Sequence, residues 1–163
     1  VLNKDWDIFV IPGVEVTHSP LKEIPVLVKY ARKNGAKIVI VHGETVSEPV
    51  IPGTNRYAIE AGCDILAHPG NIEEEDVELA AGRGTALEIT TRFHHSSTNR
   101  HVLNLAKRCG AKMVLDNDAH SPSDSSSAES AREFLTALGL NPDEISQIFR
   151  NSEDIVTRIK AGC

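Results

Sequence analysis

The sequence alternates short apolar runs with amphipathic segments, and this alternation limits the folds that are open to it. Five runs of four or five residues consist mostly of β-branched residues and leucine, at 7–11, 37–41, 64–67, 85–89 and 112–115. Short apolar strands separated by amphipathic helices are typical of a parallel sheet covered by helices. The sequence therefore predicts an α/β fold built from repeated strand–loop–helix units.

The expected helices are marked by capping residues and by glycines. They lie between the apolar runs or after them, at 20–33, 54–61, 73–81, 97–109 and 127–138, and a glycine follows most of them closely. Two further capped segments, beginning at Asn141 and Asn151, are expected to close the chain. A chain of 163 residues has the length of one domain, so residues 1–163 are predicted to form a single domain.

The composition and charge of the chain argue against a membrane protein and against a dedicated nucleic-acid-binding protein. The apolar runs are far shorter than the ~18–20 residues that span a bilayer, and no signal-peptide pattern is seen, so a cytoplasmic protein without membrane association is expected. The net charge of −6 makes nucleic acid an unlikely partner, without excluding it, because binding phosphates requires a basic surface. The same charge is compatible with an acidic site that collects divalent cations.

Residues able to carry chemistry follow every apolar run, on the side where the predicted strand ends. In chain order these are Glu15, His42, His68, Arg92 and the pair Asp118 and His120. The carboxyl ends of parallel strands meet at one edge of a sheet, which is where active sites of α/β barrels assemble. We therefore expect these side chains to lie together.

Five of these residues, namely Glu15, His42, His68, Asp118 and His120, form a mixed nitrogen and oxygen ligand set. Such a set suits Zn, Mn or Fe, and its carboxylates can bridge two ions. Asp118 and His120 are two residues apart, which places both side chains on one side of an extended strand end. Each residue alone is more often a structural histidine, a turn residue or a helix cap, but together they favour a metal site.

Four motifs of the chain resemble the PHP (polymerase and histidinol phosphatase) family of metal-dependent phosphoesterases, most closely its short archaeal-type members. They occur in the order of the family and extend over nearly the whole chain: Ile11-Pro-Gly-Val-Glu15, His42-Gly-Glu-Thr-Val-Ser-Glu-Pro49, Asp64-Ile-Leu-Ala-His-Pro-Gly70 and Asp118-Ala-His120. The resemblance implies a distorted (β/α)7 barrel that holds two or three divalent ions.

Within that resemblance Glu15 is the bridging carboxylate, His42 and His68 are ligands of single ions, and Asp118 and His120 form the closing pair. One departure is clear, because the His-x-His pair that opens the family's pattern does not precede Glu15. The barrel is therefore expected to lack its first strands. Either a segment is missing from the chain as given, or this is a natural short form.

The activity that the resemblance implies is hydrolysis of a small phosphoester by a metal-activated water. The expected catalytic residues are the ligands Glu15, His42, Asp118 and His120. Arginine matches phosphate oxygens well, so Arg56 and Arg92 are predicted to bind the substrate, with His95 as a further contact.

Two alternatives remain open. An amidohydrolase-type C–N hydrolase also carries histidine and aspartate ligands at its strand ends, although it usually has a lysine bridge. A non-catalytic relative of the PHP family, acting as a binding subunit, would have lost ligands and would carry a basic surface. The edges of an unclosed barrel also leave homo-oligomerisation open.

Overall fold

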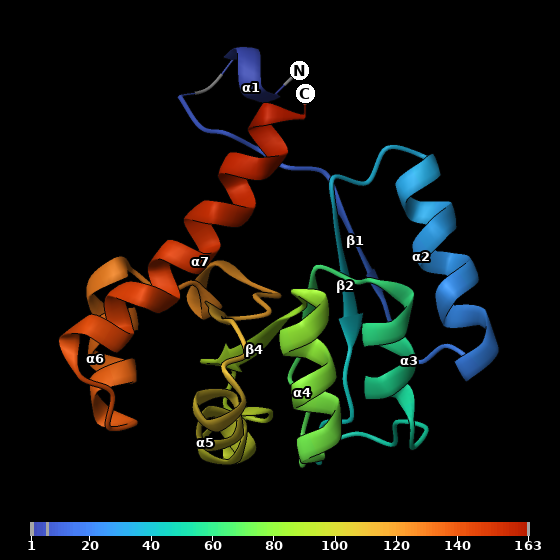
Figure 1. The fold of residues 1–163 in the computed structure, drawn as a ribbon. Coiled ribbons are helices and arrows are strands. Elements are labelled where there is room, and N and C mark those ends of the chain that lie inside the picture. Colours follow the sequence, from blue (N-terminus) through green and yellow to red (C-terminus); the bar gives the residue numbers. More distant parts are fainter. Residues whose placement is uncertain (1, 6, 163) are drawn as a thin grey trace.

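A computed structural model describes residues 2–5 and 7–162 (Figure 1). The strands are β1 (Gly13–Val16), β2 (Ile38–His42), β3 (Ile65–Ala67), β4 (Ala86–Thr90) and β5 (Met113–Asp116). The helices are α1 (Leu2–Asp5), α2 (Ile24–Lys33), α3 (Thr54–Ala61), α4 (Glu74–Arg83), α5 (Asn99–Cys109), α6 (Ala128–Ala137) and α7 (Pro142–Ala161), with 3-10 turns at Leu21–Glu23, Ser96–Thr98 and Pro122–Asp124. No helix in this described part combines the length and the apolarity that crossing a membrane requires.

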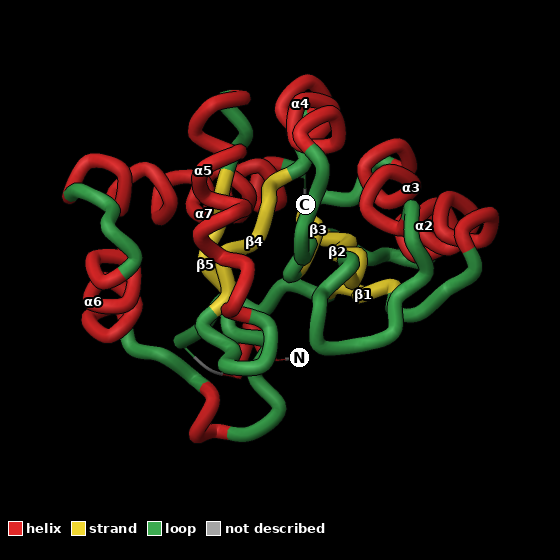
Figure 2. Tube along the Cα trace, turned by 90° about the horizontal axis from the view of Figure 1, so that it is seen from below, coloured by secondary structure: helices red, strands yellow, loops and turns green. Residues whose placement is uncertain are grey.

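The five strands form one parallel sheet in the order β1-β2-β3-β4-β5, which confirms the predicted α/β architecture. Seen along the strands, the sheet curves into an arc, and helices α2 to α5 lie side by side on its convex side (Figure 2). Among the described residues β1 and β5 each pair with one neighbour, so these five strands do not close a barrel.

The first strand differs from the prediction, since it runs from Gly13 to Val16 and not over residues 7–11. Gly13 pairs with Ile38, and a Cβ at this position would lie 2.6 Å from Cγ2 of Ile38. Lys37 N donates to the carbonyl of Pro12 at 2.9 Å, which fixes the same register. Glu15 consequently lies within β1, where a turn following the strand was expected.

The end of the chain also differs, because one helix replaces the two predicted capped segments. Asn141 caps α7 as expected, since its side chain accepts from the N–H groups of Asp143 and Glu144. Asn151 lies in the middle of α7, where its Nδ2 donates to the carbonyl of Met113 at 2.8 Å. This contact attaches α7 to the edge strand β5.

Alternate strand residues face two different layers. The larger apolar core lies between the convex face and the helices and includes Val39, Leu66 and Leu87. A smaller core on the concave face joins Ile65, Ala86 and Val114, with Ile38, Ile40 and Ile155 of α7 packed against it. The concave face is thus apolar toward the strand starts.

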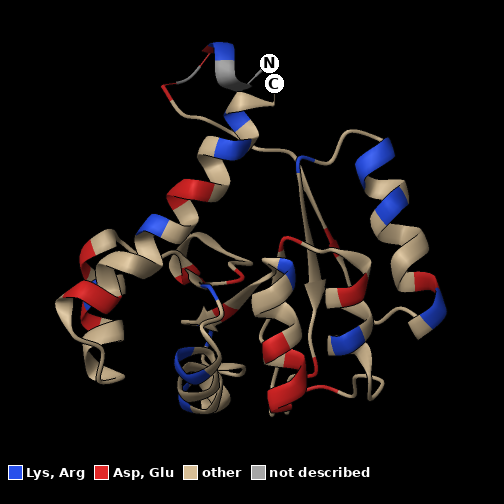
Figure 3. Cartoon of the chain, in the orientation of Figure 1, with Lys and Arg blue, Asp and Glu red and all other residues tan. Residues whose placement is uncertain are grey.

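Charge is distributed unevenly along the strand direction. Lys and Arg lie at the upper ends of α2, α4 and α7 and at the start of β2, and others lie on α3, on α5 and just before α2, whereas the lower end of α4 is acidic (Figure 3). The strand starts lie at the upper end of this view, so the two ends of the sheet offer different electrostatic surroundings.

Candidate metal centre

Two glycines bring the loops after β2 and β3 into contact. Gly43 N donates to the carbonyl of Ala67 at 2.8 Å, and a Cβ on Gly43 would lie 2.5 Å from that oxygen. Gly70 has φ +63°, and a Cβ there would lie 1.8 Å from the carbonyl oxygen of Glu44. Only glycine permits this approach, which places the residues at the ends of β2 and β3 side by side.

Three buried histidines meet where these loops join the loop after β4. His42, His68 and His95 each offer a ring nitrogen, and these nitrogens lie within 4.8 Å of one another. The ring centroids of His68 and His95 are 4.2 Å apart in a stacked arrangement, and those of His42 and His68 are 4.3 Å apart edge to face. We call these three residues the histidine triad.

The Nδ1 atom of each triad ring already has a partner. His42 Nδ1 is 3.0 Å from the carbonyl of Gly43, and His68 Nδ1 is 2.9 Å from Glu88 Oε2. His95 Nδ1 lies 2.8 Å from the hydroxyls of both Thr45 and Ser47. The carbonyl and the carboxylate can only accept, so they place the proton on Nδ1 of His42 and His68 and leave Nε2 of these two rings for a ligand. The hydroxyls at His95 can donate or accept, so they hold the ring without choosing its tautomer.

The Nε2 atom of His68 is buried and has no hydrogen-bond partner in the described structure. Leaving a buried polar atom unpaired is costly, so it needs an explanation. A divalent cation would provide one, because imidazole Nε2 is a common ligand of Zn and related ions. The donor set of the triad therefore fits a metal ion.

The three rings of the triad differ in the direction in which the protein shifts their pKa. Burial lowers the pKa of both His42 and His95, and the charge of His68 lowers them further. Burial also acts to lower the pKa of His68, but its hydrogen bond to Glu88 and the charges of Glu88, Glu15 and Asp118 outweigh this, so the pKa is raised. Two of the rings are thus favoured in the neutral form that binds metals.

Glu48 extends the cluster toward the solvent. Its carboxylate lies 2.9 Å from His18 Nε2, 3.3 Å from His42 Nε2 and 3.6 Å from His95 Nε2. The hydrogen bond from His18 holds the pKa of Glu48 below its usual value, and burial opposes this only in part. His18, His42 and Glu48 also satisfy the distances for a metal-binding group.

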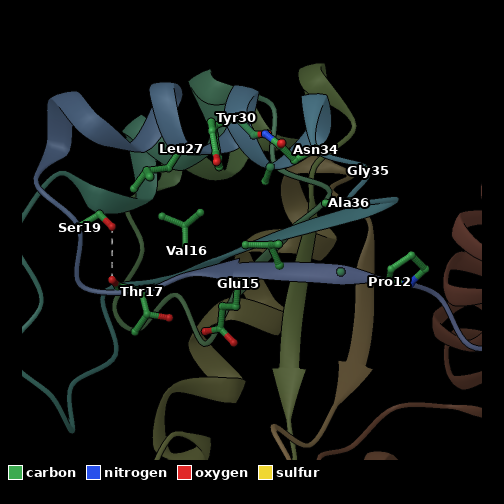
Figure 4. Close-up of a pocket in the computed structure, with 13 residues that line it drawn as sticks. Pro12, Glu15, Val16, Thr17, Ser19, Leu27, Tyr30, Asn34, Gly35 and Ala36 are labelled. Atoms are coloured by element: carbon green, nitrogen blue, oxygen red, sulfur yellow. Dashed lines mark hydrogen bonds between the residues drawn. The ribbon is translucent and has the colours of Figure 1, made fainter.

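The other predicted ligands lie outside both of these groups. Glu15 points away from the apolar cavity of about 510 Å³ between β1 and α2, whereas Val16 points toward α2 (Figure 4). Partial burial raises the pKa of Glu15, the charge of His68 lowers it, and Asp118 adds to the rise. Glu15 belongs to neither of the two groups whose ligand atoms lie within 4.8 Å of one another, and its role as a bridging carboxylate stays a prediction.

Asp118 and His120 pair with protein groups. His120 Nε2 is 3.2 Å from Asp118 Oδ1, and His120 is exposed. Arg92 Nε lies 3.3 Å from Asp118 Oδ2, and Arg92 also donates to the carbonyl of Asp118. Asp118 is thus paired with a guanidinium in this structure, and its role as a metal ligand stays a prediction.

The three residues predicted to bind the substrate have partners within the chain itself. Arg56 Nη2 forms an ion pair with Asp76 Oδ1 of α4 at 2.7 Å. Arg92 binds Asp118, and His95 belongs to the histidine triad. The two arginines are therefore engaged with carboxylates of the chain itself.

The sequence did not identify the groups that surround the triad. Glu88 is only 2% exposed within the buried strand β4, and a charged residue inside an apolar run was the available signal. Glu48, Thr45 and Ser47 lie in the loop after β2, within the motif from His42 to Pro49, but no role was assigned to them from the sequence.

Backbone strain gathers at the same end of the sheet. Among the described residues the non-glycine positions with positive φ are His18 (48°), His68 (31°) and Asp118 (43°). Each follows β1, β3 or β5. Such conformations cost about 1 kcal/mol or more and persist where the surrounding structure enforces them, often at functional sites.

Comparisons with known proteins complete the description. No protein-family model matches the chain. The chain is 43% identical over 161 residues to the uncharacterized protein MJ1295 of Methanocaldococcus jannaschii, covering 97% of this chain and 74% of that protein.

Among solved structures the fold matches a chain in the cryo-EM structure of archaeal ribonuclease P with mature tRNA. The TM-score is 0.81 at 21% identity, over 97% of this chain and 72% of that one. A second match is an amidohydrolase, with a TM-score of 0.65 at 18% identity over 89% and 42% of the two chains. At these identities the likeness concerns the fold.

These findings correct the interpretation of the sequence. Membership of the PHP family is wrong, because the matches lie with the uncharacterized protein MJ1295 and with a chain of a ribonuclease P structure. The prediction of an enzyme that hydrolyses a phosphoester is wrong on the same comparisons. The expectation that a small phosphorylated substrate, and not nucleic acid, is the partner is not supported either.

Proposed function

We propose that this chain, which belongs to the same family as the uncharacterized protein MJ1295 of Methanocaldococcus jannaschii, is a non-catalytic protein subunit of an RNA-containing assembly. The observation that carries the proposal is the match of its fold, over almost the whole chain, to a chain in the structure of ribonuclease P with tRNA. Because a fold alone does not fix a function, the site must be compatible with the proposal as well.

The positions of the five predicted metal ligands support a binding role without catalysis. Of the five, only His42 and His68 belong to the histidine triad. Asp118 is bound by Arg92, and His120 is exposed. A cluster of several ions bridged by carboxylates is therefore not favoured by the geometry.

We propose further that the histidine triad holds one divalent ion, such as Zn²⁺, as a structural element. The unpaired Nε2 of His68 and the Nδ1 hydrogen bonds of His42 and His68 support this, and Glu48 is near enough to His42 and His95 to add an oxygen ligand. An ion bound there would connect the loops after β2, β3 and β4 and so contribute to folding stability.

Binding of RNA tests the main proposal. Fluorescence anisotropy with an end-labelled transcribed tRNA should show saturable binding that weakens steeply between 50 and 200 mM salt, as expected for contacts to phosphates. A labelled duplex DNA of equal length serves as the control. No binding of tRNA at micromolar protein in low salt would overturn the proposal.

Metal content tests the second proposal, and the chain offers neighbouring histidines for comparison. His95 is buried in the triad, whereas His94 is exposed and outside it. We expect elemental analysis to find about one ion per chain in the wild type and in His94→Ala, and much less in His95→Ala. Equal metal content in both variants would exclude the triad as the site.

A further inference from the structure

Opposite the histidine triad, the starts of the strands border a cavity of about 510 Å³. Its lining includes the cations Arg32, Lys37, Arg83 and Arg158 and the carboxylate of Asp64. A neighbouring cavity of about 220 Å³ shares Asp64 and Arg158 and adds Lys112 and Asp154. We call these two cavities together the basic groove.

A buried aspartate organises the groove. The side chain of Asp64 is 7% exposed, and both of its oxygens are used. Oδ2 accepts from Val39 N at 2.8 Å and from Arg32 Nη2 at 3.0 Å, and Oδ1 accepts from Arg158 Nη2 at 2.6 Å. Arg32 Nη2 also donates to the carbonyl of Gly62. One carboxylate thus holds two guanidiniums whose sequence positions are far apart.

These two guanidiniums keep donors for a ligand. An arginine has five N–H donors, and the contacts of Arg32 and Arg158 with the described residues use Nη2 alone. The side chains are 39% and 61% exposed, so their remaining donors are accessible from the groove. A guanidinium that is already oriented loses less entropy when it binds a phosphate.

The local charge is opposite to that of the whole chain. Five cations face the two carboxylates of Asp64 and Asp154 in the groove, although the net charge of the chain is −6. Arg32, Arg83 and Arg158 lie near helix ends, where part of their charge offsets the helix dipole. Lys37 and Lys112 precede strands β2 and β5, so their charge has no such partner.

We infer that the basic groove binds phosphate groups of an RNA backbone, an inference that rests on the proposed function. Arginine forks match phosphate oxygens bidentately, and a local basic surface attracts nucleic acid even on an acidic protein. The groove is lined by Lys37, Asp64 and Lys112, which precede strands β2, β3 and β5, so it is separate from the histidine triad at the strand ends. RNA binding and metal binding would then occupy opposite ends of the sheet.

The variants that test the groove remove positive charge but keep Arg32 and Arg158, the two arginines that pair with the buried carboxylate of Asp64. Replacing Arg32 or Arg158 would leave a buried carboxylate less well paired and would destabilise the fold. The groove variant is therefore Lys37→Gln/Arg83→Gln/Lys112→Gln. The control variant is Lys22→Gln/Lys29→Gln/Arg100→Gln, which removes three exposed cations outside the groove and gives the same net charge.

Binding of labelled tRNA is measured over a salt series for the wild type and both variants, after circular dichroism has confirmed equal melting temperatures. We expect the groove variant to lose about tenfold or more in affinity at 100 mM salt and to show a shallower salt dependence, with the control near the wild type. Competition with poly(U), but not with polyglutamate at equal charge, should release the tRNA.

Each other outcome is decisive. Equal losses of tRNA affinity in both variants, or no loss in the groove variant, would contradict RNA binding by the groove. Either result would leave the proposed function intact. Competition by polyglutamate as effective as that by poly(U) would assign the groove to an acidic protein segment. A wild type that binds no tRNA would overturn the proposed function and the groove together.

Discussion

Glu88 binds His68 twice through one carboxylate oxygen. Its Oε2 accepts from both the backbone N–H and the ring Nδ1 of His68, and both residues are almost fully buried. The pair therefore fixes the orientation of the ring, and Nε2 is directed to the remaining members of the triad. The left-handed backbone of His68, with φ 31°, is maintained by the same contact.

Replacing Glu88 by glutamine should weaken metal binding. Partners of ligating histidines typically contribute 10–100-fold to metal affinity, so we expect a decrease of about that size in Glu88→Gln, measured by zinc titration against a competing chelator. The free energy of unfolding should also fall by about 1–3 kcal/mol, because the buried hydrogen bonds are impaired. Glu133→Gln, on the exposed surface of α6, serves as control. Unchanged zinc affinity in Glu88→Gln would contradict this role.

Gly70 and Gly110 both have a positive φ, so a comparison of their alanine variants distinguishes the cost of that backbone conformation from the cost of a steric clash. Gly70 and Gly110 have φ +63° and +69°, but a Cβ on Gly110 would meet nothing within 4 Å, whereas one on Gly70 would lie 1.8 Å from the carbonyl oxygen of Glu44. Gly110→Ala should cost about 1 kcal/mol of unfolding free energy, the usual penalty of a left-handed alanine. Gly70→Ala should cost several kcal/mol and reduce zinc binding, since the loops must separate. Urea denaturation of both variants measures the difference, and equal costs would contradict the contact.

The attachment of α7 to β5 depends on Asn151. Its Nδ2 donates to the carbonyl of Met113, and its Oδ1 accepts from Gln147 Nε2 at 2.9 Å. Asn151→Ala removes the partner of a carbonyl on an edge strand, so we expect a loss of about 1–2 kcal/mol in unfolding free energy. Glu153→Ala, an exposed position of the same helix, should change stability little. Equal free energies of unfolding for the two variants, measured in urea, would contradict this role of Asn151.

The parts of the fold that local pattern specifies could be predicted. Strands β2 to β5 and helices α2 to α6 fall within a few residues of their expected positions, because apolar spacing and capping act over short distances. β1 could not be placed, since Gly13 is selected by its close approach to Ile38, far away in sequence. Asn151 likewise resembles a cap locally, while its partner Met113 belongs to another element.

The site was predictable only in part for the same reason. His42 and His68 were identified from their positions after strands, and His95 was identified with a different role. That Glu88 lies beside His68 depends on the register of β3 and β4. Whether Asp118 binds a cation of the solution or the guanidinium of Arg92 depends on the loop geometry, which sequence spacing does not define.

Asp116, at the end of β5, should make stability depend on pH. The residue as a whole is exposed, yet desolvation of its carboxyl group by protein atoms raises the pKa from 3.8 to about 7, and the charge of Glu88 adds to the rise. A folded-state pKa above the unfolded value means that the folded protein binds the proton more tightly. The resulting stabilisation is complete below about pH 4 and is lost as pH rises toward 7.

Asp116→Asn removes this titration together with its coupling to Glu88, so the comparison of the two proteins reports the contribution of Asp116. We expect the free energy of unfolding of the wild type, relative to Asp116→Asn, to fall between pH 4 and 7 and to remain constant above pH 8. The change should be well below the value of about 1.4 kcal/mol per pKa unit of full linkage, because Asp116 is an exposed residue whose charge solvent can screen. Urea denaturation at pH 4, 5, 6, 7 and 8 gives the difference directly. A difference that does not vary with pH would mean that Asp116 titrates alike in the folded and unfolded chain, and that the concave face does not disfavour its charge.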